Sequence, residues 1–93
     1  MTHRTQFDES LDILEVLNDV SSLIVYNDEV NTFDWVIESL VEICGHDQIQ
    51  AEQCAFIIHH KGKASVKEGE KRKLKPMRDA LIDRGIDAVL EVK

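Results

Sequence analysis

The sequence is poor in several residue types, and each shortage excludes a class of protein. Its 93 residues include two cysteines, Cys44 and Cys54, which form no C-x-x-C pair, so a disulfide framework is not expected. One proline and four glycines are too few for a collagen-like or low-complexity chain. No apolar run approaches the roughly 20 residues that cross a bilayer, and residues 1–10 lack the apolar stretch of a signal peptide. We therefore expect a cytoplasmic protein with no membrane partner and two reduced thiols, at least one of them buried.

Basic residues are scarce in the first two thirds of the chain. Residues 1–60 carry one basic and twelve acidic side chains, a net charge of −11, whereas residues 61–93 carry ten basic and six acidic ones, a net charge of +4. Phosphate neutralisation supplies most non-specific affinity for nucleic acid, so this acidic chain is not expected to bind it. The local excess of positive charge, mainly in residues 61–78, is suited to an acidic protein surface.

The remaining composition is that of one small globular domain. Apolar residues make up 43% of the chain and charged residues 31%, and 93 residues supply one modest core. Residues 1–20 are predicted to form a flexible N-terminal extension, in which residues 11–19 fit either a short helix or an extended arm. Residues 21–93 are predicted to form the core domain.

The first half of this core domain reads as a strand followed by a helix. Residues 22–27 are a short apolar run that stops at a polar cluster, which is typical of a buried strand. Asn31 is the predicted N-cap of the helix, with Asp34 in a capping-box position, and Gly45 is its predicted end. Apolar residues then recur at helical spacing, at Phe33, Val36, Ile37, Leu40, Val41 and Cys44.

The second half reads as helix, strand, helix and strand. A helix begins at the predicted cap Asp47 and ends at Gly62, and its last turns are apolar nearly all round, which predicts deep burial. Residues 63–68 alternate as a half-exposed strand that Gly69 breaks. A third helix covers about residues 71–84, with its regular part predicted to begin near Lys75 because of Pro76, and residues 86–92 form the last strand. This order predicts an α+β fold in which helices cover one face of a small sheet.

Enzyme and metal motifs are missing from the sequence. It contains no Gly-rich phosphate loop, no G-x-S-x-G and no H-E-x-x-H. Both cysteines lie on apolar helix faces, where core packing explains them better than pairing with His59 as a nucleophile. The metal hypothesis, with His46, His59 and His60 as ligands, is weak because adjacent helical histidines diverge by about 100°. We therefore predict no catalysis, no metal and no cofactor.

Two polar clusters remain, each with an ordinary explanation. The cluster Asn27-Asp28-Glu29 follows the first strand, as in many turns. The pair His59-His60 ends the second helix, where one histidine could be buried and the other face solvent. Taken together they are more specific, because a strand end and a helix end can converge beside an apolar hole formed by Phe33, Val36 and Ile58.

At this point the sequence resembles a known family. The stretch LIVYNDEVNTFDWVIESL, then IIHHKGKA after the second helix, then LKPMRDALIDRG resembles the ClpS family, the adaptor proteins of the ATP-dependent Clp protease. The resemblance covers about residues 22–93. Its markers are the N-D-acidic motif after the first strand and the H-x-x-G-K motif after the second helix. It implies a small three-stranded antiparallel sheet covered by three helices, in the order β-α-α-β-α-β.

The resemblance also implies a function. Family members bind proteins with a bulky hydrophobic N-terminal residue, an N-degron, and deliver them to the N-terminal domain of a Clp AAA+ unfoldase for degradation. Asn27, Asp28 and His59 match the positions that bind the α-amine, and a protonated amine needs such acceptors. The positions of the pocket and its rim are matched by Glu29, Asn31, Phe33, Val36, Ile58 and, least closely, Ile86.

Three features depart from the family pattern. Phe33 stands where many members have Met, and a rigid ring is less adaptable than a thioether, which affects the size preference of the pocket. Asn31-Thr32 replaces a common Thr-Pro pair at the start of the helix. The basic stretch from Lys67 to Met77 differs from the mixed-charge surface that contacts the unfoldase, so the docking face is altered or fits another unfoldase.

Two other classes of function stay open from the sequence. A plain protein-interaction module of similar fold, such as the C-terminal domain of the bacterial ribosomal stalk protein, would have no need for the combination of Asn27, Asp28 and His59. A nucleic-acid binder that uses the basic residues 61–78 would show steep salt dependence. The adaptor is the leading hypothesis.

Overall fold

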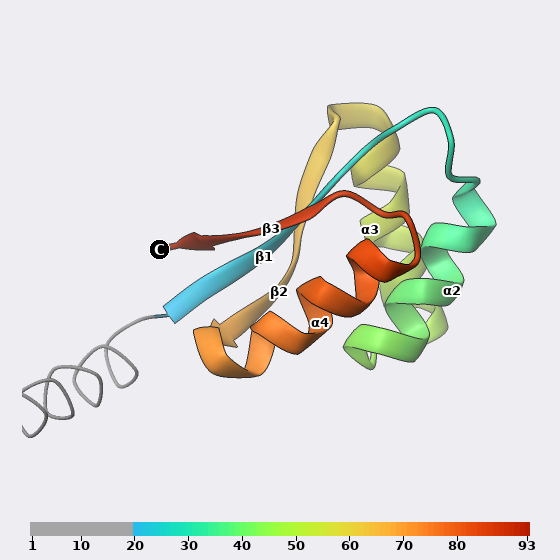
Figure 1. Ribbon diagram of the computed structural model, residues 1–93. Coiled ribbons are helices and arrows are strands. Elements are labelled where there is room, and N and C mark those ends of the chain that lie inside the picture. Colours follow the sequence, from blue (N-terminus) through green and yellow to red (C-terminus); the bar gives the residue numbers. More distant parts are fainter. Residues whose placement is uncertain (1–19) are drawn as a thin grey trace, which may run out of the picture.

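The computed structural model describes residues 20–93, which form six elements in the predicted order (Figure 1). These are strand β1 (Val20–Tyr26), helices α2 (Phe33–Cys44) and α3 (Gln48–Lys61), strand β2 (Lys63–Glu70), helix α4 (Lys71–Asp83) and strand β3 (Ala88–Val92). The predicted α+β fold is confirmed. The predictions for the N-terminal extension lie outside the described residues, apart from Val20, which begins β1.

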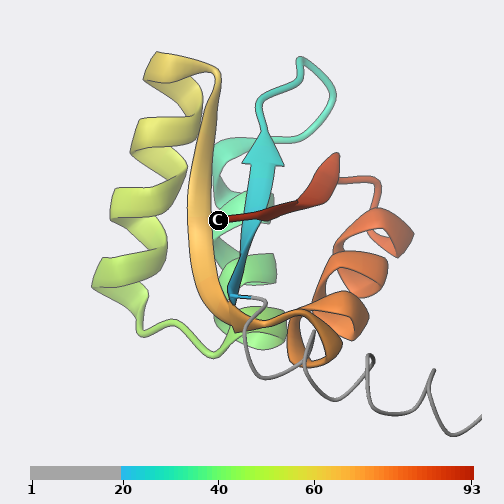
Figure 2. The ribbon, with the colours of Figure 1, turned by 90° about the vertical axis from the view of Figure 1, so that its left-hand side faces the viewer.

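The sheet places β1 in its centre. Its strand order is β2-β1-β3, and both outer strands run antiparallel to β1. The helices lie on one side of the sheet, with α2 behind β1 and α3 and α4 to either side of it (Figure 2). Leu23 and Val25 of β1 are fully buried, because neighbouring strands flank them and helices cover their face. The centre of the core therefore lies between β1 and α2.

A bulge in β2 is held by a buried histidine. The pairing shifts between Leu23 and Ile24, whose partners are Lys67 and Ser65, so Val66 has no partner on β1. The ring nitrogen Nε2 of His46 lies 2.7 Å from the carbonyl oxygen of Val66. A carbonyl only accepts hydrogen bonds, so Nε2 carries a hydrogen and donates it to Val66. His46 thus has a structural task next to the bulge.

The cap residues explain where α2 and α3 begin and end. Gly45 and Gly62 adopt left-handed conformations, with φ of 74° and 92°, and end α2 and α3 as predicted. Asp47 caps α3 as predicted, since its carboxylate accepts a hydrogen bond from the Gln50 N–H at 2.7 Å. The predicted cap of α2 is wrong: Thr32, not Asn31, accepts from the Trp35 N–H at 3.0 Å.

The predicted deep burial of the end of α3 is also wrong. Its buried residues are Ala51, Ala55 and Ile58, whereas Phe56 and Ile57 are exposed. The helix lies at one side of the molecule and packs mainly against α2 and β2 (Figure 2). Its buried face uses small alanines, and its outer face has no neighbour among residues 20–93. Apolar residues all round the helix therefore do not imply burial all round it.

Three local predictions in the second half differ from the structure. Helix α4 begins at Lys71, so Pro76 lies inside the helix rather than in its first turn. The N–H that Pro76 lacks would have reached the carbonyl of Arg72, which is an exposed residue. Gly69 does not break β2 but pairs with Ser21, and the strand continues to Glu70. The last strand begins at Ala88, two residues later than predicted.

One of the two cysteines lies in the core, as expected. Cys44 is buried and Cys54 half-buried, and both are free. Within residues 20–93, no helix combines the length and the apolar character that crossing a membrane requires.

Candidate functional site

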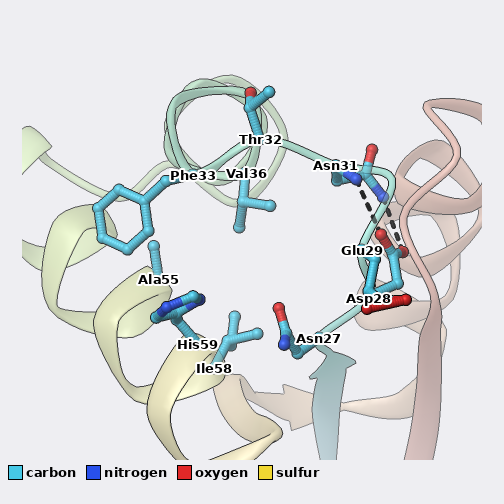
Figure 3. Close-up of a pocket in the computed structure, with 10 residues that line it drawn as sticks. All are labelled: Asn27, Asp28, Glu29, Asn31, Thr32, Phe33, Val36, Ala55, Ile58 and His59. Atoms are coloured by element: carbon cyan, nitrogen blue, oxygen red, sulfur yellow. Dashed lines mark hydrogen bonds between the residues drawn. The ribbon is translucent and has the colours of Figure 1, made fainter.

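A cavity of about 600 Å³ opens where the end of β1, the start of α2 and the last turns of α3 meet (Figure 3). Ten residues line it: Asn27, Asp28, Glu29, Asn31, Thr32, Phe33, Val36, Ala55, Ile58 and His59. Eight of them are site residues proposed from the sequence. The strand end and the helix end therefore converge at one cavity.

Backbone hydrogen bonds hold this convergence in place. The N–H of Asn27 donates to the carbonyl of Gly62 at 2.8 Å, which ties the end of β1 to the end of α3. One residue earlier, the N–H of Tyr26 donates to the carbonyl of Asp87 at 2.9 Å. The first residue after β1 is thereby fixed beside the last turn of α3, where His59 lies.

Asp28 organises the loop that forms one wall of the cavity. Its Oδ1 accepts hydrogen bonds from the N–H groups of Val30, at 2.9 Å, and Asn31, at 2.8 Å. These bonds favour the charged carboxylate, so they lower the pKa of Asp28, with the Asn31 N–H as the main cause and partial burial acting against it. Asp28 is therefore a carboxylate at neutral pH, and most of its acceptor capacity serves its own loop.

Asn31 joins this loop to the segment between α4 and β3. Its amide Nδ2 donates to Asp28 Oδ2 at 2.8 Å and to the carbonyl of Gly85 at 2.8 Å. Gly85 lies between α4 and β3. These bonds hold the Asn31 side chain toward Asp28 and Gly85, and the hydroxyl of Thr32 caps α2 instead. Asn31 thus positions the loop as well as lining the cavity.

The apolar wall comes from one face of each helix. Ala55, Ile58 and His59 are spaced at i, i+3 and i+4 on α3 and so share a face. Opposite them, Phe33 and Val36 come from the first turns of α2. The ring centroids of Phe33 and His59 are 6.3 Å apart at an interplanar angle of 87°, an edge-to-face contact across the two helices.

The cavity combines acceptors with an apolar hole. Its lining includes two carboxylates and no lysine or arginine. In Figure 3 the Asn27 side chain points into the opening, between Val36 and Ile58, whereas Asp28 turns toward Asn31. Within residues 20–93, no protein group donates to the Asn27 side-chain carbonyl or binds the His59 ring nitrogens. Such an arrangement suits a ligand that has a cationic donor next to an apolar group.

Three residues show what sequence reasoning missed at this site. Ile86 lies in the hydrophobic core at 2% exposure and is not among the residues that line the cavity. Ala55 and Thr32 line the cavity but were not proposed. The helical spacing from Ile58 and His59 back to Ala55 could have identified it, whereas Thr32 could be found only once it replaced Asn31 as the cap.

The cysteines and His46 do not join this site. Burial raises the pKa of the Cys44 thiol to about 11. The charge of Lys67 lowers this pKa and Cys54 raises it, but both effects are smaller than that of burial. The reactive thiolate is therefore disfavoured. Burial also raises the pKa of Cys54. His46 precedes α3 and His59 lies near its end, which puts the two histidines roughly 20 Å apart along the helix. They cannot share a metal ion.

Comparisons with known proteins agree with this fold. A family model described as "ATP-dependent Clp protease adaptor protein ClpS" matches residues 18–87. Among solved structures, the chain is similar to Agrobacterium tumefaciens ClpS2 bound to L-phenylalaninamide, with a TM-score of 0.70 and 17% sequence identity. That match covers 82% of this chain and 99% of the other. No curated protein sequence matches the chain.

Proposed function

This chain belongs to the ClpS family of adaptor proteins for the ATP-dependent Clp protease, and we propose that it binds polypeptides through a free N-terminus with a bulky apolar first residue. The observation that carries the proposal is the cavity that joins Asn27 and His59 to the apolar wall of Phe33, Val36 and Ile58. The bound phenylalaninamide of the similar structure supports it, because that molecule has a free α-amine beside an aromatic side chain.

Each group of the ligand has a counterpart in the cavity. The ammonium donates to the side-chain carbonyl of Asn27 and to a ring nitrogen of neutral His59, and such charge-assisted bonds contribute about 1.5–3 kcal/mol each. Asp28 and Glu29 add negative charge on the same side. The first side chain enters between Val36 and Ile58, which contributes about 1.5–3 kcal/mol for Leu or Phe. After the cost of association, micromolar or modestly tighter affinity follows.

The second part of the proposal is non-catalytic delivery to a Clp AAA+ unfoldase in the cytoplasm. The pocket lies at the Tyr26 end of β1, whereas the basic start of α4 follows Glu70, the partner of Val20 at the other end. Six residue steps of strand place these ends roughly 20 Å apart. The protein can therefore hold a substrate and a docking partner at the same time. The predicted N-terminal extension assists delivery in this proposal.

The start of α4 is suited to docking on an acidic surface. Lys71, Arg72, Lys73 and Lys75 are exposed there. Cations near a helix N-terminus are unfavourable by about 0.3–1 kcal/mol each at the surface, because the macrodipole is positive there. Glu70 compensates only in part, at 3.5 Å from Arg72 and 3.9 Å from Lys73. This uncompensated charge supports an acidic face on the N-terminal domain of the unfoldase as the partner.

The test of the substrate proposal is a peptide series that differs only in the first residue. We expect peptides that begin with Leu, Phe, Tyr or Trp to bind at least tenfold more tightly than peptides that begin with Gly or Asp, by calorimetric titration. Equal affinities would instead favour the plain interaction module without a degron pocket. The cavity at the predicted motif residues supports the adaptor over that alternative.

A further inference from the structure

The outer face of α3 carries large apolar side chains that nothing in residues 20–93 covers. Ile49, Phe56 and Ile57 are 67%, 56% and 42% exposed. Together with Glu52 and Gln53 they line a shallow hollow of about 510 Å³, which we call the α3 hollow. Exposed apolar groups that gather in one place mark interaction sites more often than scattered ones do. The α3 hollow is therefore a candidate binding surface that the pocket does not explain.

A series of ring contacts connects the pocket to the α3 hollow. Phe33 contacts His59 at the mouth of the pocket, and the His59 and His60 rings have centroids 5.4 Å apart. The His60 and Phe56 rings follow at 4.1 Å. Phe56 is part of the α3 hollow. A continuous series of imidazole and aromatic rings thus joins the two sites, with no lysine, arginine or carboxylate in the series.

The distance between the two sites fits a short stretch of polypeptide. The two ring-to-ring steps from His59 to Phe56 form a path that about three residues of an extended chain cover, at roughly 3.3–3.6 Å each. A polypeptide whose first residue fills the pocket beside His59, and which leaves the pocket along these rings, brings its third to fifth residues over Phe56. We propose that the α3 hollow is a second subsite for the same substrate, which takes an apolar side chain at one of these positions.

This inference rests on the proposed function, and continuity with the pocket is the reason to choose the substrate as occupant. The lining of the α3 hollow favours an apolar group, because Glu52 is its one charged residue. The Glu52 carboxylate accepts a hydrogen bond from Gln48 at 2.9 Å. A Leu or Phe side chain of the substrate would be partly buried against Ile49 and Phe56. This burial should tighten binding by about three- to tenfold.

The experiment combines a peptide series with variants of the full chain. The peptides begin with Phe and continue with Gly and Ser, and a single Leu replaces Ser at position 3, 4 or 5. A further peptide has Gly in place of the first Phe. For the wild type, at least one Leu peptide should bind three- to tenfold more tightly than the Ser peptide, by fluorescence anisotropy. In Phe56→Ala this ratio should fall to about one. Ile82→Ala, which truncates a half-exposed apolar residue on α4, is the matched control and should keep the wild-type ratio.

The outcomes separate this inference from the proposed function. If peptides with Phe at the start bind no better than peptides with Gly there, the proposed function fails. If that preference holds but no Leu position improves binding, or the improvement persists in Phe56→Ala, the second subsite is wrong. The inference is also overturned if Phe56→Ala leaves the ratio unchanged and instead abolishes self-association in sedimentation or binding to an unfoldase N-terminal domain.

Discussion

Asp28 and His59 both line the pocket, but their side chains are used differently. The Asp28 carboxylate accepts three hydrogen bonds from Val30 and Asn31, at 2.8–2.9 Å. The imidazole of His59 contacts the Phe33 ring and has no hydrogen-bond partner among residues 20–93. In our proposal Asp28 shapes the loop and supplies charge, while Asn27 and His59 contact the ammonium directly.

The stability that Asp28 contributes should depend on pH. Its pKa is lowered in the folded protein, mainly by the Asn31 N–H. Its contribution is therefore complete above the ordinary carboxyl pKa, about 3.9, and is lost as the pH falls through the lowered value. We expect Asp28→Ala to reduce the free energy of unfolding by about 1 kcal/mol at pH 7, and by less at pH 3, in urea denaturation. A difference that is the same at both pH values would contradict this account, and Glu91→Ala on the exposed end of β3 is the control.

The two adjacent histidines should respond differently to substitution. A ring nitrogen of the imidazole can accept a hydrogen bond from the substrate ammonium. His59→Ala should therefore lower the affinity for a Leu-initiated peptide with Gly and Ser at the following positions, and His60→Ala should not, by calorimetry. A larger loss in His60→Ala would refute the assignment of His59.

Phe33 should control which first residues enter the pocket. Its ring stands at the mouth, in the first turn of α2, against His59. Phe33→Ala enlarges the opening, so the disadvantage of Ile- and Val-initiated peptides relative to Leu and Phe should shrink by at least threefold. Competition titrations with the four peptides measure this. If the relative affinities stay the same, Phe33 does not select the first residue.

At the scale of elements, the start of α2 is held by two neighbours with separate tasks. The Thr32 hydroxyl accepts from the Trp35 N–H, while the Asn31 amide joins Asp28 to Gly85. Thr32→Ala removes the cap and should lower the free energy of unfolding by about 1 kcal/mol. Thr32→Ser keeps the hydroxyl and should lose much less. Equal losses in the two variants would show that packing of the threonine methyl group, rather than the cap, stabilises the helix.

Helices and strands could be predicted because their signals are local. The apolar run of β1, the cap Asp47 and the stops Gly45 and Gly62 act on the residues next to them. Burial of α3 could not be predicted in the same way. Phe56 and Ile57 are as apolar as core residues, but the number of helix faces that receive a neighbour depends on the whole arrangement. The prediction that Asn31 caps α2 is wrong for a similar reason. The Asn31 side chain binds the carbonyl of Gly85, which is 54 residues away in the sequence.

The site residues come together for a reason that the sequence shows only in part. The motifs of Asn27 and His59 mark a strand end and a helix end, and the bond from Asn27 to Gly62 joins them. Ala55 follows from helical spacing, but a small buried residue gives no chemical signal of its own. Ile86 is apolar and close in sequence to Gly85, and its place in the core depends on the packing around it. The binding roles of these residues remain predictions.

At the scale of the whole molecule, negative and positive charge are concentrated in different parts of the chain. Residues 1–60 carry a net charge of −11 and include the strand end, loop and helices that form the pocket. Residues 61–93 carry +4 and include α4, on the other side of α2 from α3 (Figure 2). In our proposal, the cationic N-terminus of a substrate is attracted to the first part and an acidic partner to the second.

The free N-terminus of the substrate is the central element of this account, and N-acetylation tests it most directly. Acetylation removes the positive charge and two donors of a Phe-initiated peptide but leaves its side chain unchanged. We predict that the acetylated peptide binds at least tenfold more weakly, a loss of about 1.4 kcal/mol or more, in calorimetric titrations of the wild-type chain. Equal affinity of the free and acetylated peptides would contradict the account.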